Sequence, residues 1–478
     1  MLLNRHNVAV AELRPIKVIQ FGAGNFLRAF AEYLIQSANE HFGFNGNVAI
    51  VQYVSPQGAL QINQQDGLYT LLLQGIKNSV VVQEKQIIDC VTQAINPNLD
   101  YQAFLALADL PEVRYIISNT TEAGIVFNPT DKFSDMPAST FPAKLVQLLY
   151  RRFTSVKGNI NKGFIILPCE LIENNGLCLK QICEQYVDLW KLGNDFKLWL
   201  NNANHFCSTL VDRIVPGFPK SAPELGYEDK LLTMAEQYYS WIIADAEKIK
   251  DELVFNQEAF NVKLVNDLTV YRDLKVRILN GTHSALVPVA YLLGIDTVRE
   301  AVEDTRVGKF IRQLIFNEIV PTIKIDSSEC EEFAYDVLER FANPFIEHHL
   351  MSIALNSLAK FKTRDLPIIL DYQAQFKCIP AHLSLSLAAL LVFYRGSFAK
   401  REQIDLVDDV QFIAYFKSSW DGFAIDGNID KLTNQLLKNK SVWGVDLSKN
   451  IQLTEAISNY VGKILSGSLA KLVEELDT

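Results

Sequence analysis

Lys275, Asn280 and His283 carry side chains that together could move a proton on and off an alcohol. They lie in the stretch DLKVRILNGTHSAL, residues 273–286. A lysine can give and take the proton, an amide can donate a hydrogen bond to the oxygen, and an imidazole can do either. Each residue also has an ordinary role, because lysine on a helix is usually solvated and Asn-Gly usually marks a turn.

The same stretch predicts one amphipathic helix that would position these side chains. Asp273 is expected to cap its N-terminus through a side-chain oxygen. At about 100° per residue, Lys275, Asn280 and His283 fall within roughly 140° of one another around an α-helix. We therefore expect them to face one cleft. The apolar residues that recur at helical spacing are Leu274, Ile278, Leu286, Val289 and Leu293.

A glycine turn near the start of the chain predicts a dinucleotide site. The β-prone run 17–21 stops at Gly22-Ala-Gly24, and a helical pattern follows from Asn25 and Phe26. In such a unit the glycines let the backbone approach a pyrophosphate at the helix N-terminus. The usual third glycine is replaced by a leucine, and glycine pairs also make ordinary turns. Arg28 is a further candidate to meet a phosphate, with a surface position on the helix as its alternative.

Two later strands of the same domain bear on the cofactor. The run 47–54 predicts a second strand, and Ser55-Pro-Gln-Gly58 follows it with neither an acid for a ribose nor a cation for a 2′-phosphate. We therefore expect NAD rather than NADP. The strand 113–118 ends in a polar loop, and Asn119, Thr120 and Glu122 are candidates to contact the cofactor there, with turn chemistry as the alternative. The runs 69–75 and 79–88 predict a hairpin.

The character of the sequence changes in its second half. From about residue 298 helical patterns dominate, as in 305–316, 331–341 and 383–394. We predict an α/β Rossmann-type NAD-binding domain at 1–265 and a mostly α-helical substrate and catalytic domain at 266–478. Lys275 then stands on the first long helix at the domain junction, where ligand clefts are common.

Composition excludes several classes of function. Of 478 residues 49% are hydrophobic and 21% charged, and the net charge of −10 gives no footprint for nucleic acid or an acidic membrane. No apolar run is long enough to span a bilayer, and the N-terminus lacks the apolar core of a signal peptide. The seven cysteines form no C-x-x-C pair and no zinc-like cluster. We expect a cytoplasmic protein without a metal that acts on a small molecule, as a monomer or a dimer.

The spacing Lys275-x4-Asn280-x2-His283, with Gly22-x-Gly24-x3-Arg28, resembles the long-chain polyol dehydrogenases of the mannitol dehydrogenase family. The similarity covers most of the chain, including Val211-Asp-Arg213 and the loop 119–124. It implies a Rossmann domain, a helical C-terminal domain, a nicotinamide cofactor and no metal. It also implies that Lys275 is the acid/base and that Asn280 and His283 lie near the reacting oxygen.

Two longer stretches resemble the sugar-acid branch of that family, the tagaturonate reductases or altronate oxidoreductases. They are LPCELIENNG at 167–176, and RFANP at 340–344 through SIALNS at 352–357. This resemblance implies the NAD-dependent interconversion of tagaturonate and altronate. Fructuronate reductase and neutral polyol dehydrogenase are alternatives on the same scaffold. An NAD-binding regulatory protein that has lost catalysis is an alternative from another class.

The positions of cationic side chains predict which residues contact the substrate. An acidic protein needs a group of cations to hold a carboxylate, and the segment 356–364 supplies one, with His348 before it. Lys360 and His348 are the first candidates, and a solvated helix end is their ordinary alternative. Asp212 is a candidate to orient Lys275 or a substrate hydroxyl, or else a structural turn residue. Leu171 stands where the mannitol branch has an asparagine that donates to the substrate oxygen, so another group must donate here.

Overall fold

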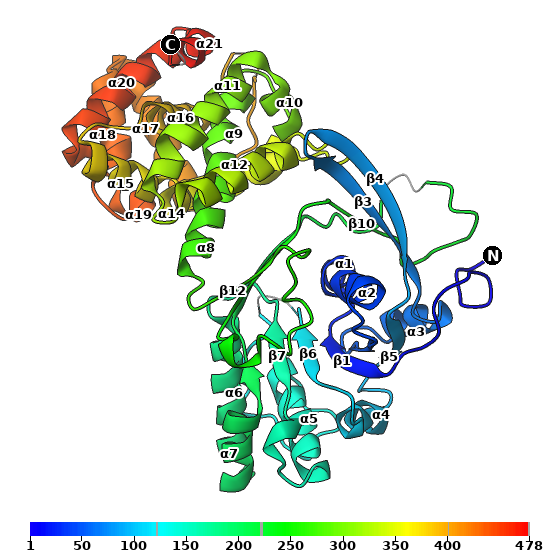
Figure 1. Cartoon of the computed structure of the whole chain (residues 1–478). Helices are drawn as coiled ribbons and strands as arrows, with labels where there is room; N and C mark the ends of the chain where they lie inside the picture. Colours follow the sequence, from blue (N-terminus) through cyan, green and yellow to red (C-terminus); the bar gives the residue numbers. More distant parts are fainter. Residues whose placement is uncertain (121–122, 220–222, 400, 477–478) are drawn as a thin grey trace. The chain divides into compact units, whose positions relative to one another are not determined.

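The computed structural model describes residues 1–120, 123–219, 223–399 and 401–476 (Figure 1). The chain divides into two compact units, Met1–Leu268 and Thr269–Thr478. The first unit is a Rossmann-like α/β domain and the second is mostly α-helical. The predicted fold class is therefore confirmed. Among the described residues, no helix combines the length and the apolarity needed to cross a bilayer.

A six-stranded parallel sheet organises the first unit. Its strand order is β5-β2-β1-β6-β7-β8, which is the order 3-2-1-4-5-6 of dinucleotide-binding folds. The order reverses between β1 and β6, so the loops that follow these two strands meet at the edge where such folds bind ligands. The strands are β1 (Ile16–Phe21), β2 (Asn47–Val51), β5 (Val91–Ile95), β6 (Tyr115–Ser118), β7 (Ile165–Pro168) and β8 (His205–Phe206).

Helices follow these strands and cover both faces of the sheet. The helix expected after the glycine turn is interrupted at Phe30, whose φ of −123° and ψ of −78° leave the helical region. The helices of this unit are α1 (Asn25–Ala29), α2 (Ala31–His41), α3 (Pro56–Gln64), α4 (Tyr101–Ala106), α5 (Phe141–Ser155), α6 (Asn175–Leu189) and α7 (Asn194–Ala203), with short 3-10 turns η1 (Leu107–Asp109), η2 (Ile160–Lys162) and η3 (Glu247–Ile249).

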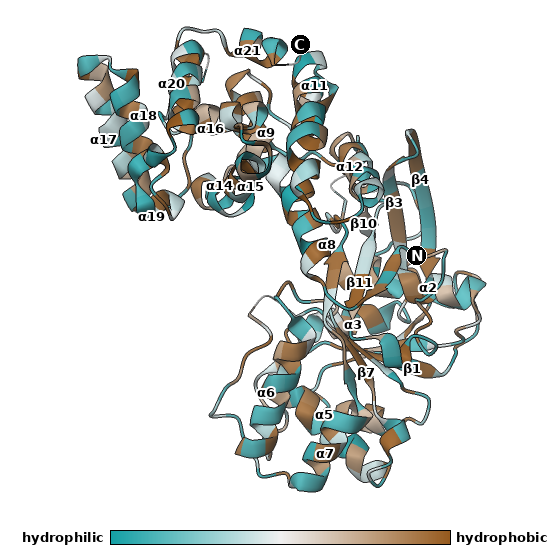
Figure 2. Cartoon of the chain, turned by 60° about the vertical axis from the view of Figure 1, so that its left-hand side comes forward, coloured by the Kyte–Doolittle hydropathy of each residue, from teal (hydrophilic) through white to brown (hydrophobic). Residues whose placement is uncertain are grey.

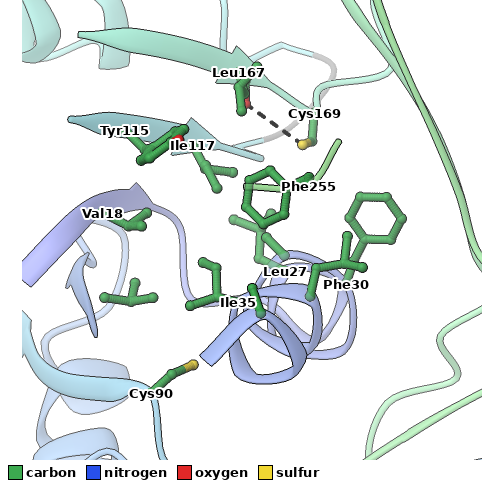
Figure 3. Packing of buried hydrophobic residues seen from close by; sticks show 14 of the residues in the cluster. Val18, Leu27, Phe30, Ile35, Cys90, Tyr115, Ile117, Leu167, Cys169 and Phe255 are labelled. Atoms are coloured by element: carbon green, nitrogen blue, oxygen red, sulfur yellow. Dashed lines mark hydrogen bonds between the residues drawn. The ribbon is translucent and has the colours of Figure 1, made fainter. Parts of the chain in front are cut away.

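The alternation of side chains along β1 divides the core of this unit in two. Val18 points to a cluster with α1 and α2, whereas Ile19 and Phe21 point to a second cluster on the other face, with α4 to α7. Figure 3 shows the first cluster, where Leu27 and Phe30 lie beside side chains from β6 and β7. Both faces of the sheet are thus buried, as parallel sheets require.

The predicted hairpin is confirmed as β3 (Tyr69–Lys77) and β4 (Val80–Ile88), which pair antiparallel. With β10 (Thr233–Ala235) they form a separate three-stranded sheet. Figure 2 shows β3 mostly brown and β4 mostly teal, in line with the buried residues of β3 and the exposed residues of β4. A third sheet holds β9 (Thr209–Asp212), β11 (Ser240–Ala244) and β12 (Val262–Val265).

The second unit is a bundle in which the predicted helical segments are confirmed as α11, α12 and α16. Its elements are α8 (Thr269–Leu274), the π-helix η4 (Lys275–Gly281), α9 (Thr282–Leu292), α10 (Val298–Glu303), α11 (Thr305–Gln313), the π-helix η5 (Leu314–Ile319), η6 (Val320–Thr322), α12 (Ser327–Phe341), α13 (Leu350–Ile353), α14 (Ser357–Arg364), α15 (Leu366–Phe376), α16 (Ala381–Phe393), α17 (Val410–Asp426), α18 (Ile429–Lys438), α19 (Lys440–Trp443), η7 (Leu447–Lys449), α20 (Ile451–Leu465) and α21 (Leu469–Glu475).

Helix α16 lies at the centre of this bundle. Every residue from His382 to Phe393 is buried, and the helix packs against α9 and α20. Its N-terminus follows Pro380, which offers no side-chain cap. The buried carboxylate of Glu318 takes that role, because it accepts the backbone N–H groups of His382 at 2.7 Å and Leu383 at 2.8 Å. A negative charge at a helix N-terminus is also favoured by the helix dipole.

The prediction of one regular helix from Asp273 is wrong. The helix begins one turn earlier, at Thr269, so Asp273 lies inside α8 and does not cap it. The chain then passes through seven residues of π-helix before it continues as α9. This change of helical register moves the predicted catalytic side chains relative to one another.

Candidate dinucleotide and substrate sites

The first unit holds the predicted glycine turn, and Gly22 is placed where no other residue fits well. Its φ is +106°, and a Cβ there would lie 2.7 Å from the carbonyl oxygen of Asn119. The backbone N–H of Asn119 in turn donates to Phe21 at 3.1 Å. The loops after β1 and β6 therefore touch at the point where the strand order reverses.

Gly24 differs from Gly22 because the space beside it is open. It precedes α1 with a φ of −67°, and no atom lies within 4 Å of the position of a Cβ. Gly24 and Asn25 are exposed, and Phe26 is half-buried and stacks on Phe30 with ring centroids 4.9 Å apart. A ligand can approach the backbone at this turn without meeting a side chain. The turn fits the pyrophosphate of a dinucleotide.

Arg28 is not a surface residue, because only 9% of it is exposed. One of its Nη atoms donates to the side chain of Asn25, and the guanidinium lies over the ring of Tyr69, 5.6 Å from the centroid. Its Nε is buried and has no hydrogen-bond partner among the described residues. Arg28 thus holds Asn25 at the turn, while its buried Nε is left without a partner among the described residues.

Below the turn lies a buried network that the sequence did not predict. Glu32 accepts from the Gln20 side chain at 2.7 Å and from the Tyr69 hydroxyl at 2.7 Å. Burial raises the pKa of Glu32, although the hydrogen bonds from Tyr69 and Gln20 and the nearby Arg28 act in the opposite direction. This network ties α2 to β1 and β3, and so supports the turn from beneath.

Glu170 holds the loop after β6 in place. Its carboxylate is 3% exposed and accepts the Ser118 hydroxyl and both the backbone N–H and the hydroxyl of Thr120, each at 3.0 Å. Asn119 donates its side-chain amide to Cys169 at 2.6 Å. Asn119 and Thr120 therefore shape the edge of the site through bonds to the loop after β7. Burial raises the pKa of Glu170, and these hydrogen bonds oppose the rise.

The structure shows no polar side chain for the site at two positions considered in the sequence, Glu122 and Leu171. Glu122 lies outside the described residues. Leu171 is 62% exposed and its side chain carries no polar atom, so it cannot replace the asparagine of the mannitol branch.

Asp212, the candidate to contact Lys275 or a substrate hydroxyl, is the last residue of β9. It is half-buried and pairs in register with Ser240 of β11.

A lysine that the sequence reasoning missed lies beyond the end of β2. Lys144 comes from α5, and its Nζ lies 4.6 Å from the ring centroid of Tyr53 while donating to Ser139 O at 2.6 Å. Burial lowers the pKa of Lys144 to about 8, and burial raises that of Tyr53 to about 12. Because its Nζ is buried and already donates to a backbone carbonyl, Lys144 is not placed as a free cation for a 2′-phosphate.

In the second unit, the π-helix η4 begins at Lys275 and includes Asn280. A π-helix joins residue i to residue i+5, so residues five apart lie nearly one above the other. On an α-helix the same two residues would be separated by about 140°. The π register therefore brings Lys275 and Asn280 to one face. π-helices are rare and often lie at functional sites.

His283 follows on α9 and is 8% exposed. Its ring stacks on Phe341 with centroids 4.2 Å apart and meets His348 edge-on at 5.0 Å. Burial holds the pKa of His283 well below its usual value, and His348, Arg340, Arg364 and Lys360 add to this effect. The imidazole is therefore neutral at neutral pH. Its Nε2 is buried without a hydrogen-bond partner among the described residues.

Three cationic or titratable side chains gather beside these residues, and we refer to His348, Lys360 and Arg364 as the cationic cluster. Arg364 donates from Nη1 to the Ser284 hydroxyl at 3.0 Å and to Asn280 O at 3.4 Å. Lys360 donates to Ile353 O at 2.8 Å. The structure thus brings the predicted His348 and Lys360 towards His283, together with Arg364, which belongs to the predicted cationic segment 356–364 but was not a first candidate.

Next to the cluster, Asp365 is fully buried beneath the π-helix. A Cβ on Gly281 would lie 3.2 Å from its Oδ1, and neither carboxyl oxygen has a hydrogen-bond partner among the described residues. Burial raises the pKa of Asp365 well above its usual value. Burial therefore disfavours the charged form of this carboxyl, although the nearby Arg364 acts in the opposite direction.

A separate cavity of about 420 Å³ lies on another side of η4. Asp273 and Arg277 line it, and Arg277 forms an ion pair with Asp371 at 2.7 Å. None of the predicted catalytic residues lines this cavity. Within the described ranges, no group of three or more His, Cys, Asp or Glu side chains is arranged to hold a metal ion.

Comparison with known proteins decides the family. The mannitol dehydrogenase Rossmann domain matches residues 16–257, and the mannitol dehydrogenase C-terminal domain matches residues 267–465. The chain belongs to the mannitol dehydrogenase family. It is accordingly a dehydrogenase, as the resemblance predicted.

Curated relatives refine the comparison. The chain is 44% identical to an altronate oxidoreductase of Bacillus subtilis (strain 168) over 96% of its own length and 95% of that protein. It is 40% identical to an altronate oxidoreductase of Bacteroides thetaiotaomicron over 96% and 97% of the two chains. These identities extend over both units.

Solved structures share the fold. A D-sorbitol dehydrogenase in substrate-free form superposes with a TM-score of 0.79 at 19% identity, over 99% of this chain and 100% of that one. Mannitol 2-dehydrogenase of Pseudomonas fluorescens, in a ternary complex with NAD and D-mannitol, gives a TM-score of 0.63 at 18% identity, over 100% and 99%.

The two glycines of the turn give a matched prediction. Gly22→Ala should lower the free energy of unfolding by about 1–3 kcal/mol, because alanine is strained at this φ and meets Asn119. Gly24→Ala should leave stability within about 0.5 kcal/mol, yet weaken NADH binding by about tenfold or more, because the methyl group fills the open space. Denaturant unfolding and NADH fluorescence titration measure the two effects. NADH binding by Gly24→Ala as tight as that of the wild type would place the dinucleotide elsewhere.

His283 gives a prediction about pH. The unfolded chain takes up a proton on this imidazole near its ordinary pKa of 6.5, whereas the folded protein does so only at much lower pH. Below about pH 6.5 the unfolded state binds more protons, so the free energy of unfolding should fall with pH. His283→Gln should make this fall shallower, measured by urea unfolding from pH 7 to 5, while a change at the exposed His41 should not. Equal slopes for His283→Gln and the wild type would show that His283 is not a buried neutral group.

Proposed function

We propose that this protein interconverts D-tagaturonate and D-altronate with NAD(H), and that Lys275 is the acid/base. The observation that carries the proposal is the 40–44% identity, over nearly the full length, to proteins named altronate oxidoreductase. The cationic cluster beside His283 supports it, because a carboxylate substrate needs local positive charge in a protein of net charge −10.

The dinucleotide would be held by the first unit. Gly22, Gly24 and Asn25 would contact the pyrophosphate through the open turn, and Phe26 and Arg28 would border it. Asn119 and Thr120 would border the site at the loop after β6. When bound, NADH supplies the hydride for reduction of a ketone carbon. We propose NAD rather than NADP because the residues after β2 offer no cation and Lys144 is buried.

Lys275 would act on the oxygen of the reacting carbon. In reduction its ammonium group gives a proton to the developing alkoxide, and in oxidation its amine takes the proton back from the hydroxyl. The side-chain amide of Asn280 would donate to the same oxygen, and one such preorganised donor contributes about 10²–10³ in rate. The π register supports this pairing, because it puts the two side chains on one face.

The neutral His283 would add a second contact with the substrate. Its free Nε2 can donate to or accept from a hydroxyl or the reacting oxygen, depending on its tautomer. Because Leu171 is exposed and apolar, Asn280 is the amide that we assign to the oxygen. Asp212 would bind a substrate hydroxyl or orient Lys275, and His348 and Lys360 would face the carboxylate end.

A panel of ketones and cofactors tests the proposed function. We expect kcat/KM for NADH oxidation to be higher with tagaturonate than with fructuronate. With fructose it should be lower by about 10–100-fold, because fructose has no carboxylate and loses a charge-assisted contact. NADPH should be the poorer cofactor, and EDTA should have no effect. Fructose used as well as tagaturonate would favour a neutral polyol dehydrogenase, a fructuronate preference would favour fructuronate reductase, and binding of NADH with no turnover would favour a regulatory protein.

Lys275→Ala tests the acid/base. We expect kcat to fall by about 10²–10⁴-fold, since proton transfer by a positioned side chain contributes about that much. NADH affinity should hardly change, because the glycine turn belongs to the other unit. Lys250→Ala, at an exposed lysine of the first unit, is the control and should behave as the wild type. Nearly full turnover by Lys275→Ala would show that another group moves the proton.

A further inference from the structure

We infer that Arg364 is the principal ligand of the substrate carboxylate and that it makes the site select sugar acids over neutral sugars. The inference rests on the proposed function and deepens it. The sequence placed Arg364 in the cationic segment 356–364 but gave Lys360 and His348 as the first candidates. It is assigned from its restraint, its lack of an ion pair within the described ranges and its position beside Asn280 and His283.

The Arg364 guanidinium is held on one side only. Its Nη1 donates to Ser284 Oγ and to Asn280 O, both on the segment that carries the proposed catalytic residues. Its Nε and Nη2 make no hydrogen bond with any residue that the structure describes. Restraint through Nη1 fixes the plane of the fork, and the two remaining donors can meet a carboxylate side by side.

Arg364 stands next to a second cation and forms no ion pair with a carboxylate within the described ranges. Lys360 lies one turn earlier on α14, where like charges four residues apart repel each other. Neither side chain has an ion pair within the described ranges. Burial raises the pKa of the neighbouring Asp365, and Asp408 is the acid near Lys360, where it opposes the lowering of the lysine pKa by burial. Both cations also depress the pKa of His283. A bound anion would remove this repulsion, which is a reason for a protein to keep two half-buried cations together.

An arginine suits this role better than the other members of the cluster. A lysine offers a single point of charge, whereas the planar guanidinium matches the two oxygens of a carboxylate. His348 is half-buried and burial lowers its pKa, so it is a neutral neighbour at neutral pH. Lys360 would reinforce the attraction, and Arg364 would fix the direction in which the sugar acid lies.

The test compares a sugar acid with its neutral counterpart. Wild type, Arg364→Met, Arg364→Lys and Lys362→Met are assayed for NADH oxidation with D-tagaturonate and with D-tagatose, which lacks the carboxylate. Lys362 is the matched control on the same helix, because its side chain lies against Gly444. We expect Arg364→Met to raise KM for tagaturonate by about 10–100-fold, with little change in kcat or in KM for tagatose. Arg364→Lys should recover only part of the loss, and Lys362→Met should match the wild type.

Unchanged KM for tagaturonate in Arg364→Met, or an equal rise for tagatose, would overturn the inference. Thermal unfolding and NADH titration check that each variant is folded. If Arg364→Met does not fold, Ser284→Ala, which removes the restraint on Nη1, takes its place; it should raise KM for tagaturonate alone, and an unchanged KM would overturn the inference equally.

A binding measurement separates this inference from the proposed function. Calorimetric titration of the NAD⁺-loaded protein with D-gluconate probes the carboxylate contact without turnover. If the wild type does not reduce tagaturonate but binds gluconate in a manner that Arg364→Met weakens, the proposed function fails and the assignment of Arg364 stands. If tagaturonate is reduced and Arg364→Met binds gluconate as the wild type does, the proposed function stands and the assignment fails.

Discussion

The hydrogen-bond register of residues 275–281 is the constraint on which the rest of the substrate side depends. In the i→i+5 register, Lys275 and Asn280 occupy one face of the helix. In a regular α-helix an acid/base and a donor five residues apart would be separated by about 140° around the axis, so the π register brings them closer together. The helices around η4 therefore have to hold a geometry that an isolated helix would not choose, and the buried Asp365 against Gly281 is part of that packing.

The second unit contains a local group of positive charges that could attract an anion. The chain as a whole is acidic, yet Lys360 and Arg364 stand together without an ion pair in the described ranges. Burial acts on three neighbours of these cations: it raises the pKa of Asp365 and lowers the pKa of His283 and of His348, so it disfavours the charged form of each. The same low-dielectric surroundings that disfavour these charged forms strengthen the attraction of the remaining cations for an anion.

Much of the first unit could be predicted from the sequence, because its elements are encoded locally. The glycine turn, the hairpin at 69–88 and the polar loop after β6 were found from short patterns, and the strand order follows from the fold that they indicate. What could not be predicted depends on residues far apart in the chain. Glu170 bonds to Thr120 across two strands, and Lys144 reaches Tyr53 from α5, and no periodicity signals either contact.

In residues 273–286, too, the sequence predicted the chemistry but not the geometry of the side chains. The residue types at 275, 280 and 283 were enough to propose acid–base chemistry, but a 3.6-residue pattern does not distinguish an α-helix from one with a π segment inside it. Asp273 was predicted as a cap because the helix was expected to start there, whereas the helix begins at Thr269. Arg364 was predicted only as one member of a cationic segment, because the sequence does not show which cation near a helix end faces inward; the bond to Ser284 shows it for Arg364.

A crystal structure of the protein with NAD⁺ and D-altronate would test the central claim most directly, through the contacts of two groups of the substrate. The account predicts that one hydroxyl oxygen lies within hydrogen-bond distance of both Lys275 Nζ and the Asn280 side chain, and that the carboxylate meets the free edge of Arg364. A substrate whose reacting hydroxyl contacts only one of Lys275 and Asn280, or whose carboxylate points to solvent, would contradict the account.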